Sequence, residues 1–167
     1  QSWFLDLSLV MAYWGGDGAR SYHHTAPVNS LYALHESLIM LQQEGLEQAW
    51  ARHSSLHLAL KAGLEAMGLG FIVPQGSRLP QLNAVTIPEG IDEAVVRKRL
   101  LHDYNLEIGA GLGSLAGKVW RIGLMGHSAN ASNVMFCLAA LESVLSDMGA
   151  SIRTGVALPA AQKITFG

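Results

Sequence analysis

Arg121 is the residue whose type and setting most directly suggest chemistry. It stands in Val-Trp-Arg-Ile-Gly-Leu-Met (residues 119–125), a segment otherwise made of apolar residues and glycine. Desolvating a guanidinium in such a strand is offset only by a paired anion, and its planar fork matches a carboxylate. Arg121 is therefore a candidate for binding the carboxylate of a small acid. An alternative, which the sequence favours equally, is that Arg121 lies on an edge strand or pairs with an internal acid such as Glu107.

A second candidate group is Tyr22-His23-His24-Thr25, just before a helix that Pro27 opens. A helix N-terminus has unpaired N–H groups and a partial positive charge, so the Tyr22 and Thr25 hydroxyls beside it could help to bind a phosphate. On these residues alone we favour an ordinary cap, in which Thr25 satisfies the first turn. Adjacent histidines point apart and have no acidic or Cys partner at ligand spacing, so we expect no metal site.

Three other motif-like features are better explained by structure than by chemistry. His53 and His57 are spaced i, i+4 but continue an apolar helical stripe, and no Glu lies between them in the zinc-protease pattern, so we expect packed histidines. The glycine-rich residues 109–113 lack the ending of a phosphate loop and indicate a loop between two strands. Cys137, the single cysteine, lies on an apolar helix face and is expected to be a buried thiol.

Composition excludes several classes of protein. The chain has 167 residues, 50% hydrophobic and 14% charged, with a formal net charge of −2. It has enough apolar mass for a core and no basic excess, so we expect no nucleic-acid binding. The apolar run 3–14 is interrupted by Asp6, is too short to span a bilayer and lacks the flanks of a signal peptide. A soluble, cytoplasmic protein without membrane contact is expected.

The elements that must position these residues follow from apolar spacing and from the Gly, Pro and Asx residues between segments. Residues from 151 onward have no clear period and are expected to run over the surface. Helices are predicted over 3–14, from Pro27 to Gly45, over 46–67 and 93–104, and from Asn130 to Met148; strands are predicted over 69–73, 83–87, 106–110 and 119–125.

This order predicts an α+β fold: N-terminal long helices, then a β-β-α-β-β-α sandwich with one small sheet and helices on a single face. A boundary is expected near residue 45, between the helical region and the compact sheet domain.

Several runs of the sequence also carry a family resemblance. Trp-Phe-Leu-Asp (3–6), Tyr-Trp-Gly (13–15), Tyr-His-His-Thr (22–25) and Gly-Lys-Val-Trp-Arg-Ile-Gly-Leu-Met-Gly (117–126) follow one another in this order. They resemble the region after the cofactor lysine in alanine–glyoxylate and serine–glyoxylate (serine–pyruvate) aminotransferases, and the match is collinear to about residue 149. These are class V, fold type I enzymes that use pyridoxal 5'-phosphate.

The resemblance implies roles for the candidate residues. The family forms homodimers with active sites at the subunit interface. Tyr22 and Thr25 match the residues that reach the phosphate of the partner subunit's cofactor, and Arg121 matches the arginine that holds the substrate α-carboxylate. Residues 1–45 would then be the end of the large domain and the interdomain helix, 46–150 the small C-terminal α+β domain, and 151–167 a C-terminal tail.

The resemblance also implies that the chain is only the C-terminal portion of such an enzyme. The family's Schiff-base lysine, its aspartate on the pyridine nitrogen and its stacked aromatic all lie upstream of the segment that matches residue 1. We therefore expect no catalytic residue in this chain and no activity from it alone. The complete enzyme would transfer an amino group from alanine or serine to glyoxylate or pyruvate. The alternative is a non-catalytic dimerisation or interaction domain derived from that fold.

Overall fold

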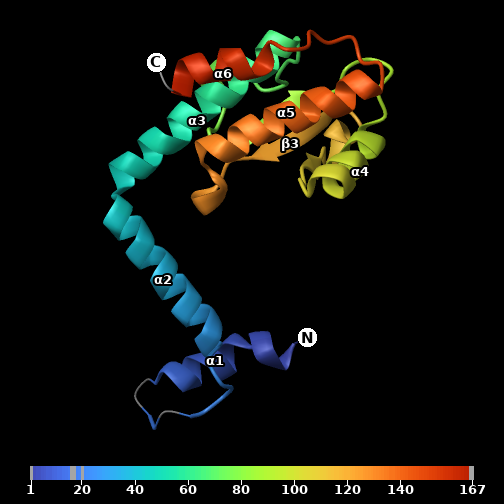
Figure 1. The fold of residues 1–167 in the computed structure, drawn as a ribbon. Helices are drawn as coiled ribbons and strands as arrows, with labels where there is room; N and C mark the ends of the chain where they lie inside the picture. The colour runs from blue at the N-terminus through green and yellow to red at the C-terminus, as the bar shows by residue number, and fades with distance from the viewer. Residues whose placement is uncertain (1, 16–17, 20, 166–167) are drawn as a thin grey trace. The chain divides into compact units, whose positions relative to one another are not determined.

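The computed structural model describes residues 2–15, 18–19 and 21–165. The chain forms two compact units, Gln1–Gly45 and Leu46–Gly167 (Figure 1).

The first unit contains the 3₁₀ helix η1 (Trp3–Leu5) and the helices α1 (Leu7–Trp14) and α2 (Val28–Glu44). The predicted helix over 3–14 is divided at Asp6, whose carboxylate accepts a hydrogen bond from Ser8 N at 2.9 Å and so caps α1. Hydrogen bonds from the Ser8 side chain and backbone lower the pKa of Asp6. At its end, α2 closes on Gly45 (φ +87°), whose N–H donates to Leu41 O.

The second unit contains four helices joined by short 3₁₀ turns in its described part. Asp92 caps one of them by accepting hydrogen bonds from Ala94 N and Val95 N, and Asn130 caps another by accepting from Asn133 N. The elements are α3 (Leu46–Met67), η2 (Gln75–Ser77), α4 (Glu93–Tyr104), η3 (Gly113–Leu115), η4 (Gly126–Ser128), α5 (Ala131–Asp147) and α6 (Ala157–Thr165).

The sheet is antiparallel, in the order β1 (Leu82–Thr86), β3 (Val119–Gly123), β2 (Gly109–Ala110). The predicted α+β class is confirmed, although the sheet is smaller than predicted. The expected strand over 69–73 is reduced to one bridge between Phe71 and Val85, because Pro74, which has no N–H to donate, closes the segment.

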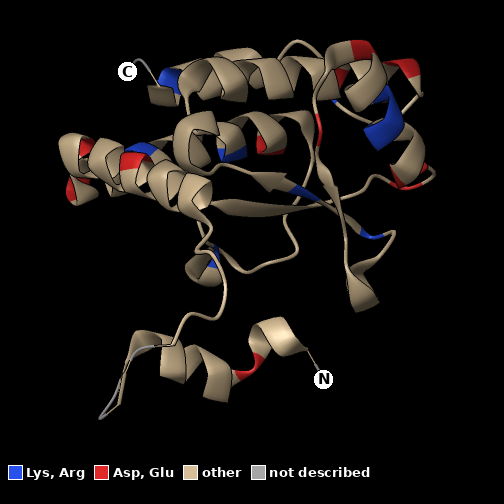
Figure 2. Ribbon diagram, turned by 90° about the horizontal axis from the view of Figure 1, so that it is seen from below, with Lys and Arg blue, Asp and Glu red and all other residues tan. Residues whose placement is uncertain are grey.

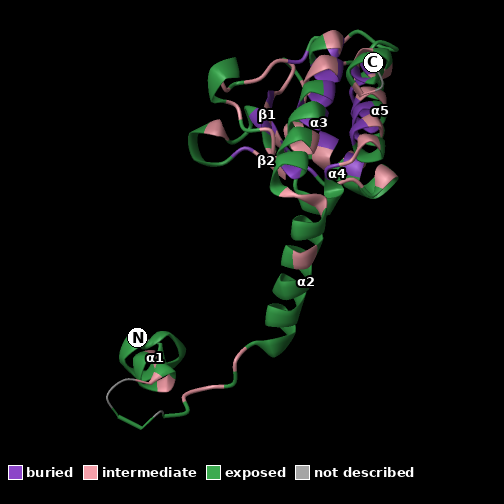
Figure 3. Cartoon of the chain, turned by 90° about the vertical axis from the view of Figure 1, so that its left-hand side faces the viewer, coloured by how far each residue is buried: buried purple, intermediate pink, exposed green. Residues whose placement is uncertain are grey.

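The core lies between one face of the sheet and the helices. Alternate residues of β3, Trp120 and Ile122, join this core together with Val85 of β1. Buried residues accordingly concentrate on the inward sides of α3, α5 and the strands (Figure 3). Arg121, between these two residues, therefore belongs to the opposite face of the sheet.

The expectation of an irregular tail is wrong, because residues 157–165 form α6. Ala157 and Ala161 of α6 are fully buried. Helix α6 can approach α3 closely because Gly63 of α3 has no side chain. A Cβ at Gly63 would lie 3.1 Å from Ala157 O. The helix was missed because its buried face is made of small alanines rather than large apolar residues.

Candidate functional site

Arg121 is positioned by the middle of β3, where it pairs with Ala84 of β1 on one side and Gly109 of β2 on the other. Its side chain is half-buried, and its Nε donates to Ala110 O at 2.7 Å. In the described part of the chain it forms no ion pair, with Glu107 or any other acid. The internal-pair alternative is therefore not what the structure contains.

Gly109 leaves room for the Arg121 side chain. A Cβ at residue 109 would lie 3.2 Å from the Arg121 Nη2 and 3.4 Å from its Nε. The absence of a side chain thus lets the guanidinium lie against β2 while its Nε is held by Ala110 O. The sequence patterns placed this glycine in both the predicted strand 106–110 and the glycine-rich loop 109–113, and gave it no role in the site. Its role depends on the pairing of β2 with β3, which no local pattern indicates.

Tyr22 and Thr25 lie together in the segment between α1 and α2. The Tyr22 hydroxyl and the Thr25 Oγ1 are 2.6 Å apart, and both residues are exposed. The capping interpretation favoured above is wrong: α2 begins at Val28, its N-cap position is Pro27, and no side chain caps it. Pro27 displaces the helix start beyond Thr25, so the two hydroxyls are directed at each other instead of at a helix terminus.

His23 and His24 are enclosed by aromatic side chains. The His23 ring centroid lies 4.1 Å from that of Trp3, and the His24 centroid 4.5 Å from that of Phe4. The buried atoms His23 Nε2 and His24 Nδ1 have no hydrogen-bond partner among the described residues. These rings therefore pack against the aromatic side chains of η1, and His24 also stacks on Tyr13, whose ring centroid lies 6.0 Å from that of Tyr22. The hydroxyl pair and these rings belong to the first unit, and Arg121 belongs to the second.

Comparison with known proteins identifies the family. No protein-family model matches the chain. The (S)-ureidoglycine–glyoxylate transaminase of Bacillus subtilis is 44% identical over 158 residues, which are 95% of this chain and 38% of that protein. The alanine–glyoxylate aminotransferase of Callithrix jacchus is 41% identical over 146 residues, or 86% of this chain and 35% of that protein. The crystal structure of a Bacillus subtilis ureidoglycine–glyoxylate aminotransferase superposes with a TM-score of 0.91 at 42% identity, covering 100% of this chain and 43% of its own.

The chain belongs to the class V aminotransferase family. It spans little more than a third of the length of the two curated relatives, 38% and 35%. The structural match shows that this part of a class V aminotransferase includes the small α+β domain at the C-terminal end.

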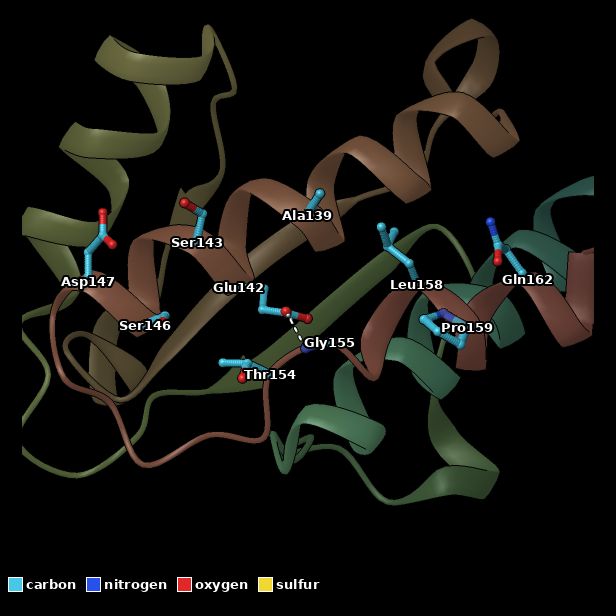
Figure 4. Close-up of a pocket in the computed structure, with 10 residues that line it drawn as sticks. All are labelled: Ala139, Glu142, Ser143, Ser146, Asp147, Thr154, Gly155, Leu158, Pro159 and Gln162. Carbon is cyan, nitrogen blue, oxygen red and sulfur yellow. Dashed lines mark hydrogen bonds between the residues drawn. The ribbon is translucent and has the colours of Figure 1, made fainter.

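Apart from the candidate residues, the described part of this class V chain has a further groove, whose acidic residues already have partners. A groove of about 580 Å³ lies between α5 and α6 (Figure 4). There the Glu142 carboxylate accepts the Gly155 N–H at 2.6 Å, and Asp147 pairs with Arg99. Its acids are therefore engaged in holding the fold. Acidic and basic residues are interspersed over the second unit (Figure 2), and no helix among the described residues is long and apolar enough to cross a membrane.

Cys137 has the buried position predicted for it. Burial raises the pKa of its thiol to about 12, so the thiol stays protonated at physiological pH. The packed interpretation of the two α3 histidines is also confirmed: His57 is buried, and His53 is half-buried.

Proposed function

We propose that the complete protein is a pyridoxal-phosphate-dependent aminotransferase that moves an amino group from alanine or serine to glyoxylate or pyruvate. Glyoxylate is favoured as the acceptor because the names of both curated relatives include it. The observation that carries the proposal is the Arg121 guanidinium, which is held by one backbone carbonyl and forms no ion pair among the described residues.

Arg121 is proposed to bind the carboxylate next to the reacting carbon. The amino donor and the 2-oxo acid both have this carboxylate, so one arginine serves both halves of the exchange. The hydrogen bond from Nε to Ala110 O fixes one edge of the guanidinium and restrains its rotation. The remaining N–H groups then form the planar fork that pairs with a carboxylate.

Tyr22 and Thr25 are proposed to hold the phosphate of the cofactor bound to the partner subunit of a homodimer. The chemistry of the site fits such a group: one of the two exposed hydroxyls, 2.6 Å apart, donates to the other, and the second O–H remains to be donated to a phosphate oxygen. When bound, pyridoxal phosphate supplies the electron sink that amino-group transfer requires. The ring contacts of His23 with Trp3 and of His24 with Phe4 hold the segment that carries the hydroxyls against η1.

The chain alone is proposed to be inactive. Of its four lysines, Lys61 is engaged with Glu65 on α3 at 3.1 Å, and Lys98 lies on α4. Lys118 directly precedes β3 and Lys163 lies on α6. None matches the setting of the family's cofactor lysine, so the chain contributes binding residues and the rest of the protein contributes the proton-transferring group.

The test is Arg121→Ala in the complete protein, with Arg121→Lys as the matched variant that keeps the charge and loses the fork. We expect the alanine variant to raise the KM for both the amino donor and glyoxylate about 10- to 100-fold, because a charged hydrogen-bonded pair is lost. The visible absorbance of the cofactor should persist, and the lysine variant should fall between. An unchanged KM for the amino donor would contradict the role.

A third amino donor, (S)-ureidoglycine, is supported by one observation. The Bacillus subtilis relative, which covers nearly all of this chain, is named for (S)-ureidoglycine. All three donors have the α-carboxylate that Arg121 would bind, so Arg121 does not discriminate among them. Measuring kcat/KM for alanine, serine and (S)-ureidoglycine at saturating glyoxylate decides the donor. A complete protein without turnover on any donor would support the non-catalytic interaction domain instead.

A further inference from the structure

His53 on α3 uses both of its ring nitrogens. Its Nδ1 lies 2.6 Å from Ala49 O, and its Nε2 lies 3.2 Å from Gly126 N. A carbonyl only accepts and a backbone N–H only donates, so Nδ1 must have a proton and Nε2 must have none. This geometry therefore requires the neutral ring, in one defined tautomer.

The neighbouring Arg52 holds the same loop. Its Nη1 donates to Gly126 O at 3.0 Å and to Ala129 O at 2.6 Å. Gly126 is thus fixed through both its N–H and its C=O, each to a side chain of α3. We call these contacts of Arg52 and His53 with residues 126–129 the α3 latch.

The latched loop directly follows β3, the strand of Arg121. Leu124 N donates to Gln81 O just beyond β3, and among the hydrogen bonds of the described residues those of the latch are the next that join the chain to another element. Within the loop, His127 O accepts from Asn130 Nδ2 at 3.2 Å, so the loop is docked on α3 as a compact turn. Its position therefore determines how the end of β3 leaves the sheet.

One turn later on α3, His57 provides a contrast. Its Nδ1 lies 2.7 Å from Asn83 Oδ1, while Asn83 Nδ2 donates to Ile122 O of β3 at 3.2 Å. The Asn83 amide orientation makes His57 Nδ1 the donor. A protonated His57 would still donate this bond, whereas a protonated His53 would present Nε2–H to the Gly126 N–H.

We infer that His53 is a pH-sensitive positioning residue for the Arg121 site, closing the latch when neutral and opening it when protonated. The inference rests on the proposed function. Within the second unit, the charged and titratable residues beside the described latch contacts are Arg52 and His57 on α3 and His127 in the loop. β1 has none, and α5 has only the buried Cys137 before Glu142. A second proton on His53 would meet the Gly126 N–H, which cannot accept it, so it acts against the latch and loosens the end of β3.

The first test measures the latch itself in the complete protein. Hydrogen–deuterium exchange over residues 125–130, corrected for the intrinsic pH dependence, is compared at about pH 8 and about pH 5.5, the range in which histidines gain a proton. His53→Gln is the matched variant, because its amide oxygen can accept the Gly126 N–H but does not titrate. Protection should fall in the wild type and persist in His53→Gln. Equal behaviour of the two proteins would overturn the latch.

The second test links the latch to the Arg121 site. Glyoxylate remains ionised over this pH range, so a change in its KM reports on the protein. Relative to His53→Gln, the wild-type KM should rise about threefold more on acidification, the factor expected for one lost hydrogen bond. His57→Asn retains a donor toward Asn83 and should keep the wild-type pH response.

The two tests separate the possible failures. A pH-dependent latch with identical KM responses in wild type and His53→Gln would overturn the positioning role. Absence of any transamination would refute the proposed function, and the exchange measurement would then decide the latch independently.

Discussion

The two units differ in where their apolar residues lie. In the second unit, 23 buried residues form one core cluster that includes Trp120, fully buried between the sheet and α4. In the first unit, none of the described residues of η1, α1 and α2 is buried, and Trp14 is 72% exposed (Figure 3). Hydrophobic burial stabilises a fold only where it occurs, so the second unit contains its own driving force and the first does not.

The largest expected effect is obtained by producing the two units separately, because only the second has a buried core. Residues 46–167 alone should unfold in one cooperative transition, with a stability of about 5 kcal/mol or more, the usual range for a domain with its own core. Residues 1–45 alone should show a gradual, non-cooperative loss of helix, because isolated helices of this length are marginal in water. Circular dichroism during heating measures both, and a cooperative transition in residues 1–45 would contradict the comparison.

A tryptophan in each unit gives a matched pair. Trp120→Ala removes a fully buried side chain and should lower the free energy of unfolding of this chain by about 3–5 kcal/mol. Trp14→Ala removes an exposed one and should change it by less than about 0.5 kcal/mol. Urea denaturation followed by circular dichroism gives both values. If Trp14→Ala becomes costly only in the complete protein, other parts of that protein cover the first unit.

Two aspartate caps give the smallest expected effect. Asp92→Ala should lower the free energy of unfolding of the second unit by about 1 kcal/mol, the usual value of an N-cap. Asp6→Ala should leave cooperative unfolding unchanged and reduce only the helicity of α1. Because the folded-state pKa of Asp6 is lowered, its cap is fully present above the ordinary carboxyl pKa and is lost as pH falls through the lowered value.

Backbone NMR chemical shifts of residues 7–14 at several pH values measure the effect at Asp6. Asp6→Asn is the control, since an asparagine cap does not titrate. An identical pH response of wild type and Asp6→Asn in the acid range would contradict this assignment.

The elements that sequence reasoning located correctly have local causes. The predicted range 93–104 is the observed α4, because Asp92 caps its start and Asn105, in the left-handed conformation, ends it. The elements that it misjudged depend on partners distant in the sequence. Nothing local indicates that the alanines of α6 pack against Gly63.

The residues of the candidate site also differ in whether local sequence is enough to single them out. Arg121 was identified because an arginine within an apolar strand is conspicuous by residue type alone. Gly109 was missed because its relation to Arg121 exists only through the pairing of β2 with β3. The cap assigned to Thr25 was wrong because Pro27 moves the helix start to Val28.

The contact between Gly109 and Arg121 also has an evolutionary consequence. A side chain at position 109 would meet the guanidinium at 3.2 Å, while a shorter residue at position 121 would remove the obstacle. A Cβ at position 109 would therefore require the guanidinium to shift by a few tenths of an ångström. We expect relatives that use this arginine to favour glycine across from it, because glycine leaves the guanidinium where the Ala110 carbonyl holds it.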